Sequence, residues 1–322
     1  MFIYLLIFIA SCVILAYAGK WLVQALSRIA DFLGWKEFTV SFFIMSAATA
    51  LPEFFVGVSS ALRGVPELSF GNIIGQSIIH FTLAIGICAL VAGSIKVESR
   101  AVRSTAWFSA LMAVLPIALI ADGTLSRPDG IILIASFVCF SLWLFSRKDN
   151  FSDTYHHRPV DMRPLWRRFA TLLGDLGMLG LGVGAIIVAA QGIIISTVWF
   201  AARLDLPLVV VGAIVVGLGT AMPEVYFSAV SARQKHGGLM IGNLLGSTAV
   251  SVSMVLGAVA LINPIVVPDM SSYLISRVFL IAAVALFLIF ISLGRRITVK
   301  EGIVFFAVYI LFIAAELIAG AL

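Results

Sequence analysis

Two glutamates, Glu53 and Glu224, lie inside long apolar stretches of the sequence, and each directly follows a proline. A charged side chain at the centre of a bilayer costs about 2.5 to 3.5 kcal/mol on insertion scales, so such a residue calls for a functional reason. Pro52 and Pro223 each remove one helix hydrogen bond and clash with the carbonyl four residues earlier. A carboxylate beside a freed carbonyl supplies oxygen ligands of the kind that broken membrane helices present to cations. The two Pro-Glu pairs therefore predict a cation-binding site.

The residues around these glutamates recur as a pair of motifs. Segments 48–53 and 71–75 read ATALPE and GNIIG, and segments 219–224 and 242–246 read GTAMPE and GNLLG. Every matched residue lies 171 positions from its counterpart, as Glu224 does from Glu53. Composition alone does not produce such a register without gaps, so we interpret it as an internal duplication. Glu316, a third glutamate in an apolar stretch, has no acidic counterpart, and we expect it to be structural.

A stripe of polar residues begins in the second motif of each copy. Asn72, Gln76 and His80 are spaced by four, which puts them on one face of a helix. The counterparts in the second copy are Asn243, Ser247 and Ser251. The Gly-x-x-x-Gly pair within each motif allows close helix contact. We therefore expect two mirrored stripes that face the two glutamates.

The ligand chemistry of this set is that of a hard cation. Carboxylate, amide, hydroxyl and carbonyl oxygens suit Ca²⁺, Mg²⁺, Mn²⁺ or Na⁺ rather than Zn²⁺ or Cu⁺. Two carboxylates neutralise one divalent ion, and Ca²⁺ accepts about six to eight oxygens in flexible geometry. Mg²⁺ loses its water reluctantly, which favours Ca²⁺ in a dehydrated site. We expect Ca²⁺ as a substrate and no organic cofactor.

The amino-acid composition indicates the kind of structure that holds this site. The chain has 322 residues, of which 61% are apolar and 11% charged, and its mean hydropathy is +1.13. Soluble domains carry roughly 25% charged residues, so a soluble, disordered or secreted disulfide-rich protein is excluded. The three cysteines form no Cys-x-x-Cys spacing, which predicts neither a disulfide framework nor a zinc site. Long apolar runs indicate an all-α integral membrane protein in contact with the lipid bilayer.

Ten apolar stretches are long enough to cross a bilayer, which needs roughly 17 to 25 residues. They are 2–27, 38–61, 69–95, 104–121, 129–146, 171–202, 207–232, 239–263, 272–293 and 302–321. With the N-terminus outside, 17 of the 21 Lys and Arg residues fall on the cytoplasmic side and 4 outside. This asymmetry follows the positive-inside rule, so we expect both termini outside. It also explains the basic residues without a nucleic-acid partner.

The order of the spans predicts how the two copies are related. Five spans separate one copy from the other, and an odd number gives them opposite orientations in the membrane. The expected plan has two inverted five-helix repeats, residues 1–146 (motif 48–80) and 171–322 (motif 219–251), joined by a cytoplasmic linker, residues 147–170. Inverted repeats are typical of secondary transporters, whose substrate site lies near the midplane between the repeats.

At these motifs the chain resembles the calcium/cation antiporter superfamily, and within it the prokaryotic sodium/calcium exchangers. The family pattern is Gly-Thr-Ser-Leu-Pro-Glu followed by Gly-Asn-x-x-Gly-Ser-Asn, once in each inverted repeat. The resemblance implies Ca²⁺ exchange for Na⁺ by alternating access, with Glu53 and Glu224 as central ligands and help from the backbone at Thr49 and Thr220. It also implies that the first and sixth helices slide across the rest. A monomer in a prokaryotic inner or plasma membrane would suffice, with inorganic cations as partners.

The chain departs from the family pattern at the positions that bind sodium. Ala50 and Ala221 replace the serine after the motif threonine, and Gln76 replaces the serine of the second motif. Ser251 stands where similar exchangers place an aspartate, and His80 adds a group that titrates near neutral pH. These changes keep the carboxylate pair but reduce the number of side-chain oxygens that could bind sodium. An H⁺-coupled antiporter of Ca²⁺ or another divalent cation is therefore the alternative.

Three other classes of membrane protein are weaker alternatives. A drug/metabolite-type carrier can share ten helices and inverted repeats, but it does not require paired Pro-Glu motifs. A channel usually builds its filter by oligomeric symmetry, whereas the symmetry here is internal. We expect no enzyme, because the apolar stretches contain neither a Ser/His/Asp set nor a His-Glu-x-x-His motif.

Overall fold

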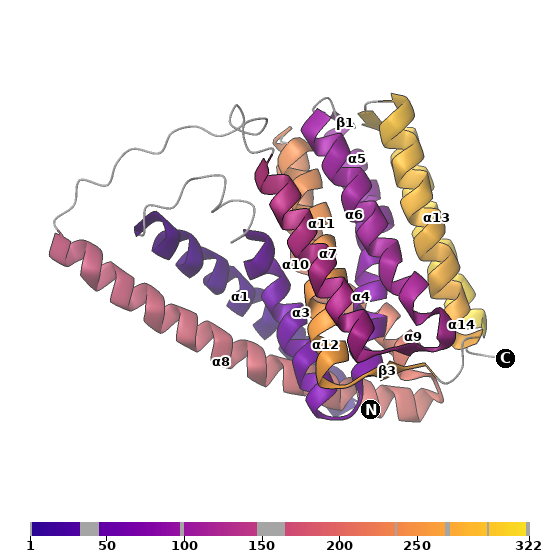
Figure 1. The fold of residues 1–322 in the computed structure, drawn as a ribbon, viewed down its shortest axis with the longest axis horizontal. Helices are drawn as coiled ribbons and strands as arrows, with labels where there is room; N and C mark the ends of the chain where they lie inside the picture. Colours follow the sequence, from indigo (N-terminus) through magenta and orange to yellow (C-terminus); the bar gives the residue numbers. More distant parts are fainter. Residues whose placement is uncertain are drawn as a thin grey trace.

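The computed structural model describes residues 2–32, 45–96, 100–146, 165–235, 237–267, 271–294 and 296–319. Almost all of these residues are helical, as the apolar composition predicts (Figure 1). The first half contains α1 (Phe2–Phe32), α3 (Met45–Leu62), α4 (Pro66–Ile79), η2 (His80–Ala84), α5 (Ile85–Ala92), β1 (Ser94–Lys96), α6 (Arg100–Leu119), η3 (Ile120–Asp122), β2 (Thr124–Leu125) and α7 (Arg127–Ser146). The second half contains α8 (Leu165–Leu204), α9 (Leu208–Val211), η5 (Gly212–Val216), α10 (Gly217–Arg233), α11 (Gly237–Val250), η6 (Ser251–Val255), α12 (Leu256–Ile262), β3 (Ile265–Val266), α13 (Ser271–Gly294), β4 (Arg296–Thr298) and α14 (Val299–Ala319).

Eight stretches of the described residues are long and apolar enough to cross a membrane. They are Phe2–Leu22, Pro66–Ala92, Arg103–Asp122, Leu173–Leu204, Leu208–Arg233, Met240–Ile262, Tyr273–Gly294 and Val299–Ala319. The other two predicted spans, 38–61 and 129–146, overlap α3 and α7. Of the predicted linker, residues 147–164 lie outside the described part, and residues 165–170 form the start of α8.

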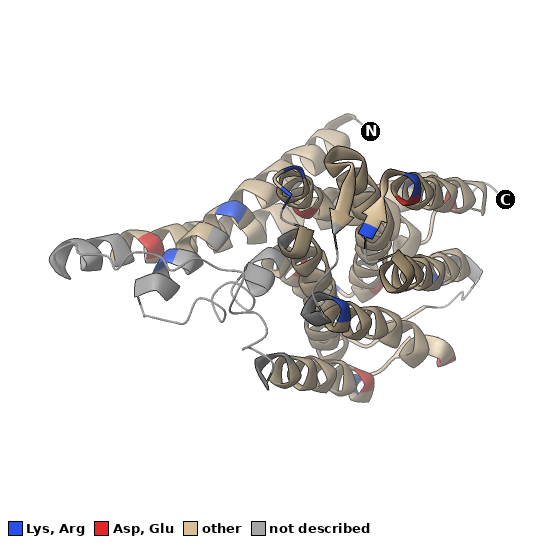
Figure 2. Ribbon diagram, turned by 90° about the horizontal axis from the view of Figure 1, so that it is seen from above, with Lys and Arg blue, Asp and Glu red and all other residues tan. Residues whose placement is uncertain are grey.

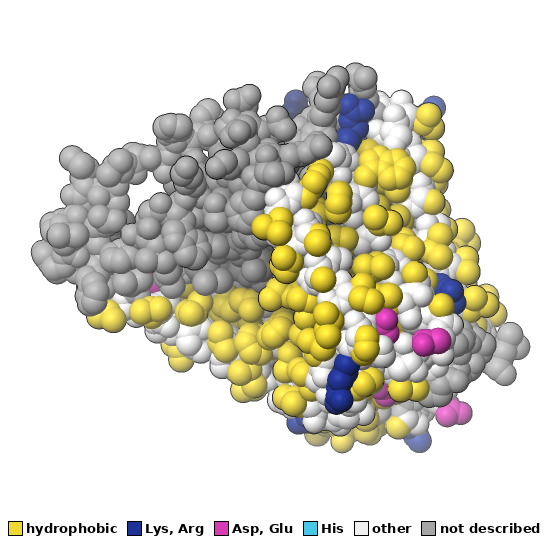
Figure 3. Space-filling view, in the orientation of Figure 1, with side chains coloured by type: hydrophobic (Ala, Val, Ile, Leu, Met, Phe, Trp, Pro, Cys, Tyr) yellow, Lys and Arg dark blue, Asp and Glu magenta, His cyan; other side chains and the backbone are white. Residues whose placement is uncertain are grey.

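Hydrophobic side chains cover much of the outer surface. Figure 3 shows them spread over the face of the helical bundle, with few charged side chains among them. Exposed examples on three different helices are Leu111, Leu142 and Leu293. Such a surface is stable against lipid tails and not against water, because apolar surface exposed to water is unfavourable.

Helices α1 and α8 form a long pair that lies obliquely across the bundle (Figures 1 and 2). Small residues allow their close approach. A Cβ on Gly192 would lie 2.1 Å from Ser11 Oγ. The rings of Tyr4 and Trp199 stack 4.5 Å apart at one end of the pair. Towards the other end, Arg28 Nε lies 2.6 Å from Asp175 Oδ1.

Two short antiparallel sheets join distant segments at opposite ends of the bundle. Strand β1 pairs with β4, with Ile95 opposite Ile297, and β2 pairs with β3, with Leu125 opposite Ile265. Asn263 Nδ2 donates to the carbonyl of Ala61 at 3.3 Å, so α3 ends near the β2–β3 sheet. Helix α11, which begins just after α10 ends, contacts β1. Helices α3 and α10 therefore end at opposite ends of the bundle.

The centre of the bundle depends on backbone contact between α4 and the segment from α9 to α10. A Cβ on Gly71 would lie 2.1 Å from the Val209 carbonyl oxygen, and one on Gly75 would lie 2.0 Å from that of Ala213. No side chain fits at either position, which is why the Gly-x-x-x-Gly pair stands there. This contact brings the first copy's second motif against the helix that carries the second copy's first motif.

Candidate cation site

Glu53 is held in the interior by a hydrogen bond from the next helix. It lies on α3 and is fully buried. Gln76 Nε2 on α4 donates to Glu53 Oε1 at 2.7 Å. Glu53 Oε2 is also buried and has no hydrogen-bond partner among the described residues. One carboxylate oxygen is thus satisfied, and the other is left for a ligand.

Glu224 lies on α10 and is 4% exposed. Its Oε2 likewise has no hydrogen-bond partner within the described residues. Both glutamate-bearing helices are hydrogen-bonded to α4, α3 through Glu53 with Gln76 and α10 through Thr220 with Asn72. In the described part of the chain, one ion pair between a basic side chain and a carboxylate is present, Arg28 with Asp175, and it involves neither glutamate. Two buried carboxylates without a basic partner are unfavourable unless a cation or protons neutralise them.

Asn72 connects the two copies directly. The hydroxyl of Thr220 on α10 lies 3.0 Å from Asn72 Oδ1 and 3.1 Å from the carbonyl of Val216, and its single hydrogen serves one of them at a time. Asn72 Nδ2 is buried without a partner in the described part of the molecule. The side chain of Thr49, the counterpart of Thr220, lies outside the described residues.

The polar stripe of the second copy is buried and only partly paired. Asn243 Nδ2 donates to Ser228 Oγ of α10 at 3.4 Å. The hydroxyls of Ser247 and Ser251 are buried and have no partner among the residues that the structure describes. Buried polar atoms without partners are rare in proteins, and each one asks for a ligand or another explanation.

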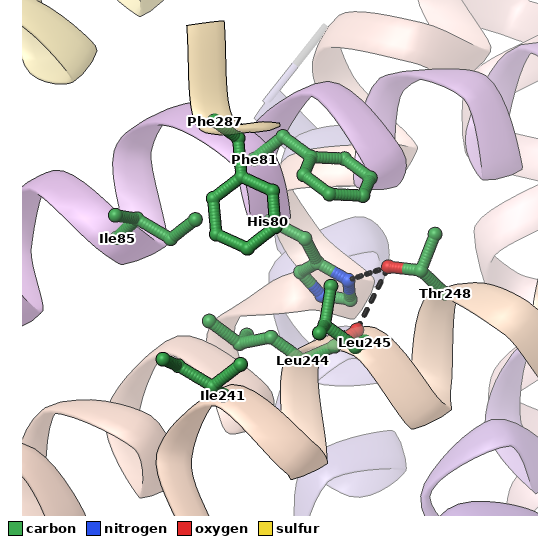
Figure 4. Close-up of a pocket in the computed structure, with 8 residues that line it drawn as sticks. All are labelled: His80, Phe81, Ile85, Ile241, Leu244, Leu245, Thr248 and Phe287. Carbon is green, nitrogen blue, oxygen red and sulfur yellow. Dashed lines mark hydrogen bonds between the residues drawn. The ribbon is translucent and has the colours of Figure 1, made fainter. Parts of the chain in front are cut away.

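His80 points toward Thr248 on α11 (Figure 4). Its Nδ1 lies 2.9 Å from Thr248 Oγ1, and the Thr248 hydroxyl donates to the carbonyl of Leu244 at 2.8 Å. A hydroxyl has a single hydrogen, so when that hydrogen is donated to the Leu244 carbonyl, Thr248 accepts from His80 and the ring carries its proton on Nδ1. The ring borders a cavity of about 10 Å³ whose other walls include Phe81, Ile241 and Phe287. His80 Nε2 has no partner in the described structure.

Helix geometry changes at two matched positions. Two π-helical turns begin at His80 and at Ser251, which are 171 residues apart. A third, η5, directly precedes α10 and its motif. π-Helical turns are rare and frequently occur at functional sites. Here η2 and η6 begin at the last residue of each polar stripe, His80 and Ser251.

Two pairs of predicted site residues are in contact with each other, and His80 is directed elsewhere. Contacts in the described structure join Glu53 to Gln76 and Asn72 to Thr220. His80 is directed to Thr248 instead of a glutamate. Ser228 and Thr248 were missed, although Ser228 follows Glu224 by four residues and therefore shares its helix face. The described residues contain no cluster of three or more His, Cys, Asp or Glu side chains, so neutral oxygens must complete any site.

Glu316 has a separate environment. Its Oε1 accepts a 2.5 Å hydrogen bond from Ser276 Oγ, which joins α14 to α13. The carboxyl group is 2% exposed and has its own hydrogen-bond partner. This contact agrees with the structural role expected for a glutamate without a counterpart in the other copy.

Two buried glutamates inside a bundle of apolar helices are typical of membrane proteins that move cations. The family model described as sodium/calcium exchanger protein matches residues 3–146 and 175–317, and the chain belongs to this family. It is therefore a multi-pass integral membrane protein of the plasma membrane, a transporter and not an enzyme. Family membership favours cation exchange over the carrier and channel alternatives.

Individual relatives span nearly the whole chain. The sodium/calcium exchanger MaX1 of Methanosarcina acetivorans is 24% identical, with 96% of this chain and 97% of the relative covered. The putative antiporter CaxA of Alkalimonas amylolytica is 25% identical, with 94% and 95% covered. A solved structure of the sodium-calcium exchanger NCX_Mj has a TM-score of 0.64 at 24% identity, with 98% and 99% covered. The structural likeness shows that the two chains share a fold.

Proposed function

We propose that this protein exchanges Ca²⁺ for Na⁺ by alternating access, with one divalent cation held between Glu53 and Glu224. The observation that carries the proposal is the pair of buried carboxylates, each with one oxygen that has no partner among the described residues. Their two charges balance one Ca²⁺, which accepts carboxylate, amide and hydroxyl oxygens. Thr220 lies on α10 with Glu224, and Asn72 and Asn243 lie on the neighbouring helices α4 and α11, so all three can supply neutral oxygens.

The charge of the site gives a physical reason for obligatory exchange. An empty site would carry two buried negative charges, and isolated charges are costly in a low-dielectric interior. Neutralisation by Ca²⁺, by Na⁺ or by protons removes most of this cost. The protein therefore switches between its outward-open and inward-open states readily when a cation or protons occupy the site, and slowly when the site is empty. This behaviour couples the outward movement of one ion to the inward movement of the other.

The α1–α8 pair is the proposed moving element. Helix α1 contacts both motif segments: a Cβ on Gly219 would lie 2.8 Å from Cys12 Sγ, and one on Gly19 would lie 3.4 Å from Pro52 Cγ. A shift of α1 along these contacts changes access to both glutamates. The close packing of α1 on α8 favours movement of the pair as one unit. In the orientation predicted from the charges, the β2–β3 end faces outside.

A specific observation keeps H⁺ coupling as the second candidate. Gln76 presents its N–H group to Glu53 where the family motif has a serine hydroxyl, and an N–H group offers no lone pair to Na⁺. Ala50 and Ala221 offer no side-chain oxygen either. Protons on Glu53 and Glu224 would neutralise the site without further ligands.

Uptake of ⁴⁵Ca²⁺ into proteoliposomes, driven separately by outward Na⁺ and outward H⁺ gradients, tests both candidates. Uptake with Na⁺ alone supports Na⁺ exchange, and uptake with H⁺ alone supports the second candidate. Glu53→Gln and Glu224→Gln should each abolish uptake, whereas Glu316→Gln, the matched control, should retain it. Transport by either of the first two variants at the wild-type rate would contradict the carboxylate site, and no uptake under either gradient would contradict Ca²⁺ exchange.

A further inference from the structure

The two copies differ one helical turn beyond their glutamates. In the second copy this position is Ser228, which is fully buried on α10 and accepts the hydrogen bond from Asn243. The matched residue of the first copy is Gly57, which has no side chain. Strict repetition would leave the first copy without a hydroxyl at this point.

A hydroxyl from another helix occupies that place. Ser69 Oγ on α4 lies 2.8 Å from the point that a Cβ on Gly57 would occupy. Ser69 is fully buried, and its Oγ has no hydrogen-bond partner in the described part of the chain. The residue that matches Ser69 in the second copy is Met240, so the sequence repeat does not reveal the relationship. Each copy thus places one hydroxyl next to the turn that follows its glutamate.

These hydroxyls lie on opposite sides of the glutamate pair. Gly57 and Ser69 lie between Glu53 and the end of α3, which reaches the β2–β3 end of the bundle. Ser228 lies between Glu224 and the end of α10, at the β1–β4 end. One turn farther on, two matched buried serines, Ser60 and Ser231, continue the polar line toward each end.

Ser69 lies beside a second buried polar atom without a hydrogen bond, which is unusual for a residue that serves only in packing. Asn72 Nδ2, three residues farther along the same face of α4, also has no partner among the described residues. A buried hydroxyl without a hydrogen bond is unfavourable relative to an apolar residue of the same size. Alanine would fill the space beside Gly57 at lower cost, so the retained hydroxyl indicates a ligand.

We propose that Ser69 and Ser228 are ligands of two transient cation positions, one on each side of the central glutamate pair. A divalent cation that has lost part of its water passes through the Ser69 position to the β2–β3 end and through the Ser228 position to the β1–β4 end. Hydroxyl oxygens suit hard cations. A neutral ligand binds a cation weakly enough to let it leave, as passage through a pore requires. This inference rests on the proposed exchange function.

The test measures the Ca²⁺ concentration for half-maximal exchange from each face separately. Reaction of an Arg63→Cys tag at the β2–β3 end with an impermeant maleimide identifies which face is outside in each proteoliposome preparation. Ser69→Ala should raise the half-maximal concentration about threefold to tenfold at the β2–β3 face and leave the opposite face unchanged. Ser228→Ala should produce the reverse pattern.

Ser109→Ala is the matched control. Ser109 on α6 is fully buried, and its Oγ also lacks a partner within the described residues, but α6 carries no residue of either motif. This variant should change neither face. A second variant combines Ser69→Ala with Gly57→Ser and so moves the hydroxyl to α3, as in the second copy. It should recover the affinity of the β2–β3 face after Val259, whose Cγ2 lies 3.0 Å from the added Cβ, shifts slightly.

The outcomes separate this inference from the proposed function. Lack of Ca²⁺ exchange by the wild-type protein overturns both. Wild-type exchange with Ser69→Ala equal to Ser109→Ala, or with an equal shift at both faces, overturns the inference alone. Thermal unfolding in detergent shows that each variant is folded before it is compared.

Discussion

Gln76 Nε2 donates a 2.7 Å hydrogen bond to Glu53 Oε1, across the contact between α4 and α3. This bond orients one of the two central carboxylates and occupies one of its oxygens. It also directs the N–H group of Gln76, and not an oxygen, toward Glu53. The family pattern has a serine at this position, so the residue bears directly on the choice of the coupling ion.

Gln76→Ser should improve coupling to sodium. The change frees Glu53 Oε1 and adds a hydroxyl oxygen, so the Na⁺ concentration for half-maximal Ca²⁺ exchange should fall at least about threefold, the effect of a single hydrogen-bond-sized interaction. Gln76→Ala is the control, because it frees the same oxygen without adding a ligand. Equal Na⁺ dependence of the two variants would show that a hydroxyl at this position binds no sodium.

Gly75→Ala should destabilise the centre of the protein. The added Cβ would lie 2.0 Å from the backbone oxygen of Ala213, which cannot move without displacing η5. Overpacking of this kind typically costs about 1 to 3 kcal/mol, and backbone contact puts this case at the upper end. The midpoint of thermal unfolding should fall, and Ca²⁺ exchange should fall with it.

Gly184→Ala on α8 provides the comparison for that variant. A Cβ there meets no atom within 4 Å in the described structure, and alanine is favoured over glycine in a helix by about 0.8 to 1 kcal/mol. Its stability should equal or exceed that of the wild type. If both variants unfold at the same temperature, the close packing at Gly75 does not contribute to the stability of the protein.

Thr248→Val should expose the cost of an unpaired histidine. Valine removes the acceptor of His80 Nδ1, and a buried donor left without a partner costs about 1 to 3 kcal/mol. Replacement of both residues, His80→Phe with Thr248→Val, removes donor and acceptor together. Thermal unfolding of the two single variants and the double variant should give non-additive losses. Strictly additive losses would mean that the two side chains do not interact.

Reversal of the ion pair between α1 and α8 tests whether the two helices move together. Arg28→Asp places two carboxylates side by side next to Asp175, whose side chain is 7% exposed, so the helices should separate and exchange should slow. The double variant Arg28→Asp with Asp175→Arg restores opposite charges and should recover most of the rate. Lys20→Ala, at an exposed position on α1, should have little effect. A double variant as slow as Arg28→Asp would contradict the pairing.

Several features of this protein follow from its amino-acid sequence alone. The membrane class follows from composition, because a chain with 61% apolar and 11% charged residues has too few charged side chains to cover a surface that faces water. Glu53 and Glu224 can be identified because their Pro-Glu motifs recur at one spacing and because a carboxylate in an apolar stretch is costly. The glycines of the second motif predict a close helix contact, and Gly71 and Gly75 make it.

Other features depend on how the helices are rotated and packed against one another, and this packing cannot be read from the amino-acid sequence. The stripe of Asn72, Gln76 and His80 lies on one helix, yet its members reach Thr220, Glu53 and Thr248 on three different helices. This packing determines that Gln76 donates to Glu53 and that His80 contacts Thr248. Ser69 beside Gly57 is the clearest case, because a hydroxyl on α4 replaces one that the repeat would place on α3. Hydrogen bonds and ligand positions require atoms within a few ångströms, and only the folded bundle brings residues so far apart in sequence to that distance.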